Sequence, residues 1–271
     1  MAINLQGAVV CVTGAARGIG QATAQALAAR GARVVLGDLD HEYAQQVAAT
    51  LGAGAQALPL DVADIASFSR FIDAAAALGP IELLVNNAGI MRTGAFAEQS
   101  IETQHREIAI NLGGVITGMR LVLPGMLARN RGHIVNVASM AGKMCVPGAA
   151  VYTASKFGVT SLSRAVRSEI AASRVTITTV LPAAVRTELT AGLDIAGVPA
   201  SSPQDVAREI VASCRHGRAE VTVPRFLAPI GAVEQVLPEK VGEMIKRAVG
   251  AQRRVSAVNE RARKYQERTS R

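Results

Sequence analysis

The stretch VTGAARGIG, residues 12–20, decides the fold expected for this chain. It joins a short apolar run to an alanine-rich segment, and Gly14, Gly18 and Gly20 occupy the pattern TGxxxGxG. Glycines at such a join let the backbone approach a pyrophosphate, which the N–H groups at the start of a helix can then hold. A tight turn alone would explain the same spacing, so the prediction of a dinucleotide site depends on the surrounding sequence.

Short runs rich in Val, Ile and Leu alternate with alanine-rich segments along most of the chain. The runs predict strands within 8–14, 33–38, 55–62, 81–89, 132–139 and 174–182, and the intervening segments predict helices within 19–31, 41–52, 64–79, about 100–130 and 149–173. This alternation indicates an α/β fold: a single Rossmann-type, doubly wound parallel sheet with helices on both faces. It places the glycine turn in the βαβ setting that a dinucleotide site requires.

The pattern changes after Pro182. Residues 187–203 are rich in Gly, Ala, Ser and Pro, which predicts a mobile loop or short helices. Beyond this segment we expect a helix over 203–217 with Ser202 as its N-cap, a strand over 219–224 and an amphipathic helix over 238–250.

The positive charge is concentrated at the C-terminal end. The formal net charge is +8, and Lys and Arg outnumber Asp and Glu by 15 to 13 in residues 1–200 but by 14 to 8 in residues 201–271. We therefore expect two parts, a nucleotide-binding and catalytic domain over 1–223 and a basic, partly amphipathic, helical extension over 224–271. The extension suits a lid, a subunit contact or a membrane-surface contact, although a packed C-terminal segment with solvated basic residues would explain the same composition. It lacks the interleaved aromatic residues of a nucleic-acid binder.

The composition describes a globular chain whose core is aliphatic. Hydrophobic residues make up 49% and aromatic residues 3%, which suits a parallel sheet covered by alanine-rich helices. The three cysteines, Cys11, Cys145 and Cys214, form no CxxC pair or Cys/His cluster, so neither disulfides nor a metal site is expected. The N-terminus lacks a signal-peptide pattern, and no uninterrupted apolar run reaches the ~18 residues of a membrane span. These features predict a cytoplasmic protein, with membrane association through the extension as the alternative.

Acidic and amide residues follow several expected strands. Asp38 ends the second strand, 18 residues after Gly20. It can accept hydrogen bonds from the adenosine ribose and would repel a 2′-phosphate, which favours NAD over NADP. Arg17 could pair with such a phosphate, so NADP stays as the alternative. Asp61 and NNAG (86–89) follow the next two strands, at the sheet edge where ligands bind, although turn and capping roles would also place them there.

Taken together, the motifs carry a family resemblance. TGxxxGxG at 13–20, NNAG at 86–89, Asn111, Ser139 and the pair Tyr152-x-x-x-Lys156 have the order and spacing found in short-chain dehydrogenases/reductases. The chain resembles that family over roughly residues 5–190. The resemblance implies a Rossmann fold and reversible hydride transfer between a secondary alcohol or ketone and a nicotinamide cofactor.

The resemblance also implies a role for each matching residue. Tyr152 would exchange a proton with the substrate oxygen. Lys156, one helical turn away, would lower the pKa of the Tyr152 phenol and bind the nicotinamide ribose. Ser139 would hold the substrate oxygen, and Asn111 would kink its helix and hold a proton-carrying water.

PAAVRT (182–187) resembles the family's PGxVxT segment, whose Val and Thr contact the cofactor carboxamide. Ala183 replaces the usual glycine, which puts the local backbone conformation in question if positive φ is needed there. No metal ligand is expected. The cofactor-binding residues implied are Gly14, Arg17, Gly18, Ile19, Gly20, Asp38, Asp61, Val62, Asn87, Ala88, Gly89, Tyr152, Lys156, Val185 and Thr187.

The substrate is expected to meet residues 90–92, 140–146 and 187–203. Their side chains are mainly apolar (Met140, Met144, Cys145, Val146, Leu189, Leu193 and Ile195). This favours a steroid-, retinoid- or lipid-like alcohol, although core packing would explain many of them equally. Lys143 and Arg186 favour the alternative, an NADP-dependent 3-oxoacyl-carrier or polyketide-type ketoreductase that receives a carrier phosphate.

The resemblance further implies a homodimer or homotetramer formed through the helices that hold Asn111 and Tyr152. Outside the enzymes, a dinucleotide-binding scaffold and a peripheral membrane protein remain as alternatives. The complete set of Ser139, Tyr152 and Lys156 argues against an idle scaffold.

Overall fold

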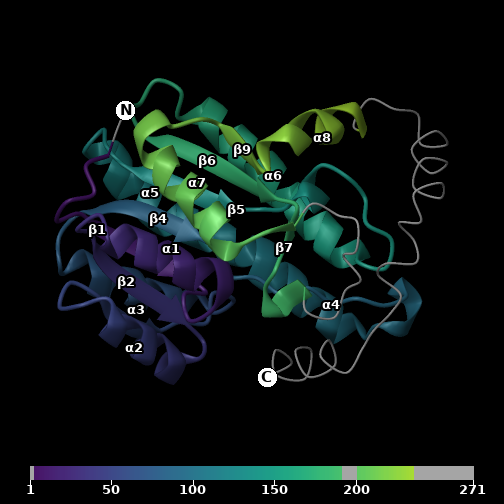
Figure 1. The fold of residues 1–271 in the computed structure, drawn as a ribbon, viewed down its shortest axis with the longest axis horizontal. Coiled ribbons are helices and arrows are strands. Elements are labelled where there is room, and N and C mark those ends of the chain that lie inside the picture. Colours follow the sequence, from purple (N-terminus) through teal and green to yellow (C-terminus); the bar gives the residue numbers. More distant parts are fainter. Residues whose placement is uncertain (1–2, 191–199, 235–271) are drawn as a thin grey trace.

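The computed structural model describes residues 3–190 and 200–234. Seven strands form one parallel sheet in the order β3-β2-β1-β4-β5-β6-β9 (Figure 1). This order steps outward in both directions from the neighbours β1 and β4, which confirms the doubly wound Rossmann-type sheet. The strands are β1 (Val9–Thr13), β2 (Arg33–Asp38), β3 (Gln56–Pro59), β4 (Ile81–Asn86), β5 (His133–Val137), β6 (Thr176–Pro182) and β9 (Glu220–Val223), and a separate short pair joins β7 (Ala184–Val185) to β8 (Ala200–Ser201).

Helices cover both faces of the sheet. Figure 1 shows α1 (Gly18–Ala28) and α7 (Pro203–His216) packed side by side in front of it. These two helices contribute to one hydrophobic cluster, which also includes residues of α2 (His41–Thr50). A second cluster on the other face holds residues of α3 (Ile65–Ala76), α5 (Gly114–Ala128) and α6 (Ala150–Glu169).

The central strand β1 shows why the sheet needs two covered faces. All five of its residues are buried. Val10 and Val12 belong to the cluster with α1 and α7, whereas Val9 and Cys11 belong to the cluster on the opposite face. Because side chains alternate along a strand, an uninterrupted apolar run such as this one can be buried only between two helical layers.

Residues Ile101–Ala128 form one long helical stretch, composed of α4 (Ile101–Ile108), a π-helical turn (Ala109–Gly113) and α5. The stretch is long and apolar enough to cross a membrane by length and composition. In this fold, however, Val115, Met119 and Val122 of α5 pack in the core. Burial against the sheet therefore accounts for part of its apolar composition.

The segment after β6 agrees with the sequence in part. Ser202 caps α7 as expected, because its Oγ accepts the N–H of Asp205 at 3.1 Å and the Asp205 carboxylate accepts the N–H of Ser202 at 2.8 Å. Within 187–203 the structure shows a 3₁₀ turn, Glu188–Thr190, and then β8; residues 191–199 are outside the described part. The helix expected over 238–250 also lies outside it.

After β9 the chain turns through Arg225–Leu227 into α8 (Ala228–Glu234), which begins the expected C-terminal extension. Three of its hydrophobic residues, Phe226, Ile230 and Val233, are at least half exposed. None of the three cysteines, all within the described residues, forms a disulfide; Cys11 and Cys214 are buried and Cys145 is exposed. Within residues 3–190 and 200–234, no cluster of His, Cys, Asp or Glu could hold a metal ion.

Candidate active site

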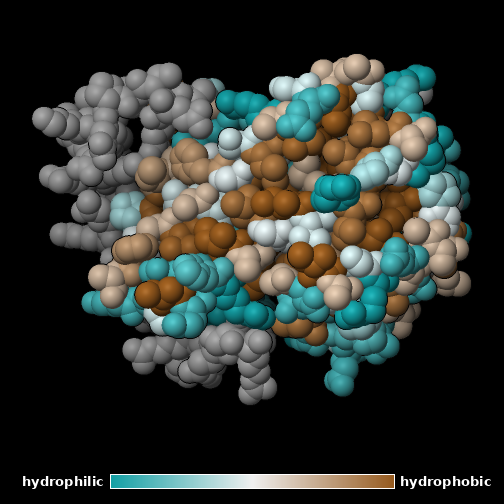
Figure 2. All heavy atoms as spheres, turned by 180° about the vertical axis from the view of Figure 1, so that it is seen from behind, coloured by the Kyte–Doolittle hydropathy of each residue, from teal (hydrophilic) through white to brown (hydrophobic). Residues whose placement is uncertain are grey.

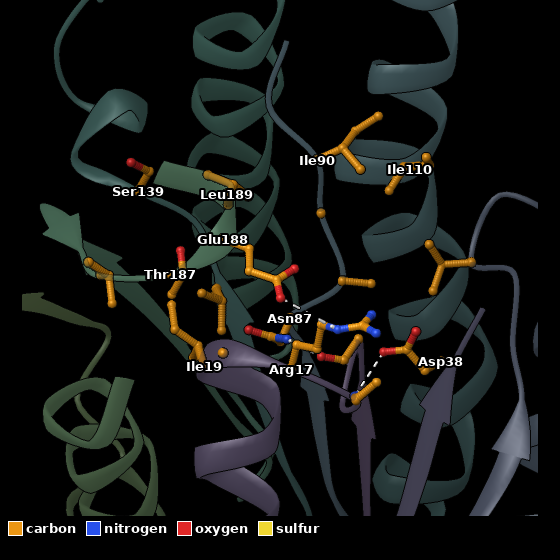
Figure 3. A pocket seen from close by; sticks show the side chains of 18 of the residues that line it. Arg17, Ile19, Asp38, Asn87, Ile90, Ile110, Ser139, Thr187, Glu188 and Leu189 are labelled. Atoms are coloured by element: carbon orange, nitrogen blue, oxygen red, sulfur yellow. Dashed lines mark hydrogen bonds and ion pairs between the residues drawn. The ribbon is translucent and has the colours of Figure 1, made fainter. Parts of the chain in front are cut away.

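A cavity of about 590 Å³ opens along the carboxyl ends of the central strands, a volume within the range of small-molecule sites. It is the crevice expected where the strand order reverses between β1 and β4. The glycine turn, the end of β2 and the segment after β6 surround it (Figure 3). Of the residues expected from the sequence it is lined by Gly14, Arg17, Gly18, Ile19, Asp38, Asp61, Val62, Asn87, Ala88, Gly89, Ser139, Tyr152, Lys156, Val185 and Thr187, but not by Gly20 or Asn111.

The glycine turn is held in place by the end of β4. Asn87 Nδ2 donates to the carbonyl oxygens of Thr13 at 2.9 Å and Gly14 at 3.0 Å, and its backbone N–H donates to Thr13 Oγ1 at 3.0 Å. Gly14 has φ of +62°, and a Cβ at Gly20 would lie 2.0 Å from Gly14 O. Both positions therefore require glycine. Gly20 does not line the cavity, but its lack of a side chain lets the turn that lines the cavity form.

The start of α1 fits an anionic ligand. The N-cap residue, Arg17, makes no side-chain capping hydrogen bond, so the first N–H groups of the helix are not satisfied by a cap. Gly18 and Ile19, which follow Arg17, line the cavity. Unpaired N–H groups and the helix dipole favour a negative charge at this point. The site thus has the donor set that a pyrophosphate needs.

Asp38 and Arg17 sit at the far end of the cavity (Figure 3). Asp38 accepts the N–H groups of Ala16 at 2.9 Å and Asp40 at 3.0 Å. Burial raises the pKa of the Asp38 carboxyl, and these two hydrogen bonds act in the opposite direction. Arg17 pairs with Asp40 at 2.9 Å, lies 3.7 Å from Glu188 and stacks over the Tyr43 ring. The guanidinium is therefore already engaged by acidic and aromatic neighbours.

Tyr152 and Lys156 lie one turn apart on α6, as the sequence predicts, and both are buried. Lys156 Nζ donates to Val137 O at 3.0 Å and lies 5.6 Å from the Tyr152 ring centroid. Ser139 follows β5; its Oγ accepts the N–H of Ala141 at 3.1 Å and donates weakly to the carbonyl of Pro182 at 3.4 Å. The three side chains line one cavity with the glycine turn.

The expected lowering of the Tyr152 pKa is wrong for the protein alone. Burial raises the pKa of Tyr152 to about 12, although a hydrogen bond with Ser139 opposes this change. Burial also lowers the pKa of Lys156 to about 8. In a dry site the loss of hydration disfavours the charged form of each group. That loss is the largest cause of the raised Tyr152 pKa, and the negative charge of Glu107 adds to it.

Asn111 lies in the π-helical turn that interrupts the long helix, a place where helices commonly kink. Its side chain accepts the N–H of Ile90 at 2.9 Å and donates to Ile90 O at 2.9 Å and to Ser155 Oγ at 3.1 Å. The carboxamide thus ties the kinked helix to the segment after β4 and to α6. Its expected role with a proton-carrying water stays a prediction.

The segment after β6 adopts an ordinary backbone despite Ala183. Among the non-glycine residues described, only Asn130 has a positive φ. Ala183 therefore causes no strain, and the question that the substitution raised is answered. Val185 and Thr187 line the cavity, as the family pattern implied.

The residues expected to meet substrate lie in several different surroundings. Met91, Ala141 and Ala149 form a small hydrophobic cluster with Tyr152, against which Val146 and Leu189 pack. Met140 and Met144 belong to the sheet core instead. Lys143 pairs with Glu220 at 2.8 Å, and Arg186 donates to Ala200 O at 3.2 Å. Cys145 is exposed, and Leu193 and Ile195 lie outside the described residues.

Sequence reasoning missed Thr13, Asp40 and Glu107. Thr13 Oγ1 accepts the N–H groups of Asn87 and Ala88, each at 3.0 Å, and Asp40 neutralises Arg17. Glu107 is fully buried, and its charge acts on both Lys156 and Tyr152. The position of Glu107 four residues before Asn111, on the same side of the helix, was the available signal.

Known proteins are similar to this chain in sequence and in fold. The family model described as short chain dehydrogenase matches residues 8–195. A 2,5-dichloro-2,5-cyclohexadiene-1,4-diol dehydrogenase of Sphingobium indicum is 38% identical over 71% of this chain and 79% of its own length. A 3-oxoacyl-[acyl-carrier-protein] reductase of Escherichia coli is 35% identical over 70% of this chain and 79% of its own. The crystal structure of a short chain dehydrogenase/reductase from Burkholderia phymatum in complex with NAD matches with a TM-score of 0.79 and 27% identity, covering 85% of this chain and 93% of that one.

Proposed function

The chain belongs to the short-chain dehydrogenase family, and from this premise we propose that it interconverts a secondary alcohol and a ketone, with NAD as the preferred cofactor. The observation that carries the proposal is that Ser139, Tyr152 and Lys156 line the same cavity as the unpaired N–H end of α1. One side of the cavity suits a pyrophosphate, and the other holds groups that can move a proton.

Each reactive side chain has a separate task. In alcohol oxidation the Tyr152 phenolate accepts the hydroxyl proton and becomes the neutral phenol, while the substrate oxygen is held by the Ser139 hydroxyl. NAD, when bound, supplies the carbon that accepts the hydride. Lys156 provides a positive charge near the phenol, because its Nζ is held by Val137 O at the end of β5 and lies 5.6 Å from the Tyr152 ring centroid. Ketone reduction is the reverse, with Tyr152 returning the proton to the oxygen.

The preference for NAD depends on Asp38 and Arg17. The Asp38 carboxylate lines the cavity and would repel a 2′-phosphate. Arg17, the cation that could have received the phosphate, is paired with Asp40 at 2.9 Å. Two carboxylates therefore oppose one guanidinium where NADP carries its additional charge. A solved relative is bound to NAD, which agrees with this preference.

An apolar substrate is favoured by the cluster of Met91, Val146 and Leu189 around Tyr152. The relative that acts on a chlorinated cyclohexadiene diol supports a ring-shaped apolar alcohol. The alternative, a 3-oxoacyl-carrier reductase, is supported by the Escherichia coli relative. The ion pair of Lys143 with Glu220, however, reduces the positive charge that a carrier phosphate would meet.

We further propose a homo-oligomer assembled through α5 and α6. The rear face of the molecule, on the α5 and α6 side of the sheet, is largely hydrophobic at its centre (Figure 2). Ile116 and Leu127 of α5 are 47% and 38% exposed. Apolar surface of this kind is stabilised by contact with another subunit. Size-exclusion chromatography with light scattering tests the assembly.

The part of the extension that the structure describes is proposed to lie against the turn that follows Ser139. Gly231 of α8 lies against the turn that follows Ser139, since a Cβ at 231 would approach Lys143 Cβ to 2.9 Å and Met140 Cε to 3.1 Å. This contact favours a lid or a packed C-terminal extension over a subunit contact or a membrane anchor.

A spectrophotometric screen at the NADH absorption band tests the proposal. Cyclic and acyclic secondary alcohols are supplied with NAD and, separately, with NADP. We expect turnover on at least one apolar alcohol with NAD favoured, whereas turnover confined to NADP and acyl-carrier ketones would support the alternative function.

A further inference from the structure

Glu107 is a buried carboxyl group on α4, which packs against α6, the helix that carries the reactive pair. It is the one buried residue of α4, and its exposed fraction is 0%. Its Oε1 accepts the backbone N–H of Arg92 at 3.0 Å. Its Oε2 is also buried and has no hydrogen-bond partner among the residues that the structure describes. Burying a carboxyl with one oxygen unsatisfied costs free energy, so core packing alone is a poor reason for a glutamate at this position.

The groups that face Glu107 come from two elements. Arg92, in the segment after β4, is 5% exposed, and Lys156, on α6, is 4% exposed. The charges of both act on Glu107, and the charge of Glu107 acts on Lys156 and on Tyr152. Its helix neighbour Arg106 is directed elsewhere and lies 3.7 Å from Asp61. A carboxylate, an ammonium and a phenol, each less than a tenth exposed, therefore interact electrostatically where α4 packs against α6.

We propose that Glu107 is a positioning residue whose protonation sets the charge state of the Tyr152–Lys156 pair, an inference that rests on the proposed function. Ionised Glu107 holds Lys156 in its ammonium form and makes the neighbouring phenolate less favourable. Protonated Glu107 removes that negative charge. The carboxyl thus acts on the reaction through the pair and touches neither substrate nor cofactor.

Glu107 changes its charge near neutral pH, where the change can affect the Tyr152–Lys156 pair. Burial raises its pKa to about 7, although the Arg92 N–H and the charges of Arg92 and Lys156 oppose the change. Lys156 has a pKa of about 8. Both groups can therefore change charge between pH 6 and pH 9, and each ionisation affects the other.

The decisive variant is Glu107→Gln, which keeps an oxygen to accept the Arg92 N–H but carries no charge at any pH. The control is Glu102→Gln, on the exposed first turn of the same helix. The rate of alcohol oxidation is measured from pH 5 to pH 10. We expect the rising limb for Glu107→Gln to move to lower pH by about one unit, the order of effect of removing one buried charge beside a titrating group. A merely structural role would lower the rate without moving the limb.

A second measurement needs neither substrate nor cofactor. The folded pKa of Glu107 lies above its ordinary value of 4.5, so the folded state binds the extra proton and stability falls as pH rises from about 4.5 to about 7. We expect the urea midpoint of the wild type to fall relative to that of Glu107→Gln between pH 5 and pH 8, and the offset of Glu102→Gln to stay constant. If Glu107→Gln does not fold, infrared titration of the protonated carboxyl in the wild type replaces it.

The outcomes separate the two proposals. An active wild type whose rate profile coincides with that of Glu107→Gln overturns the inference and leaves the proposed function standing. A wild type inactive on every alcohol and ketone refutes the proposed function, and the unfolding series then decides the inference by itself. The inference is overturned if the difference in urea midpoint between the wild type and Glu107→Gln stays constant across pH. It is also overturned if the infrared band of the carboxyl titrates near pH 4.5.

Discussion

Gly20→Ala should disable the cofactor end of the cavity. A Cβ at this position would lie 2.0 Å from Gly14 O and 2.7 Å from Asn87 Nδ2. The first of these is a backbone atom in the turn itself, so relief requires the turn to open and the 3.0 Å bond from Asn87 to Gly14 O to break. Overpacking and the lost hydrogen bond together cost about 2–4 kcal/mol, of which helix propensity returns about 1 kcal/mol.

We therefore expect the free energy of unfolding to fall by about 1–3 kcal/mol. We also expect the NADH affinity to fall at least about tenfold, because a loss of about 1.4 kcal/mol in binding free energy lowers the affinity by a factor of ten. Urea unfolding and fluorescence titration with NADH measure the two quantities. Gly54→Ala is the control, since its Cβ would meet nothing closer than 3.7 Å; it should change neither. Wild-type NADH affinity in Gly20→Ala would refute the assignment of this turn to the cofactor.

Three further predictions concern cofactor choice, pH and the extension. Asp38→Ala should raise the NADP-to-NAD ratio of kcat/KM at least about tenfold. It should also lower the free energy of unfolding by about 1–3 kcal/mol, because the N–H groups of Ala16 and Asp40 lose their acceptor. An unchanged ratio would remove Asp38 from the specificity argument. Burial lowers the pKa of His133 from 6.5 to about 4, so the unfolded state binds the proton first and stability is lost as pH falls from about 6.5 to 4, by up to about 3 kcal/mol. Urea unfolding should show this slope in the wild type but not in His133→Gln, and parallel curves would contradict it. If the extension is a lid, the full chain should not float with anionic vesicles. If it does float, and the double substitution Phe226→Ser and Ile230→Ser abolishes flotation, the membrane contact is favoured instead.

Local pattern was sufficient for the fold and for most of the site. The glycine turn, Asp38, and Tyr152 with Lys156 were predictable because each depends on a short spacing within one βα unit or one helix. Alternating apolar runs and alanine-rich segments likewise predicted the sheet, since a strand buried on both faces needs two helical layers.

Contacts between distant parts of the chain were not predictable in this way. Asn87 holds the glycine turn through Thr13, 74 residues away in sequence. Glu107 looks like one more polar residue on a polar helix until α4 packs against α6 and buries it. The pKa of Tyr152 was predicted in the wrong direction because sequence spacing gives the neighbouring charge but not the loss of hydration.

The most direct test of the central claim is the turnover of Tyr152→Phe on the best alcohol found for the wild type. The phenyl ring keeps the hydrophobic cluster of Met91, Ala141 and Ala149 but cannot accept a proton. We predict that kcat falls at least about 10²-fold, while NADH affinity stays within about twofold. Near wild-type turnover in Tyr152→Phe would show that Tyr152 does not transfer the proton and would contradict the account.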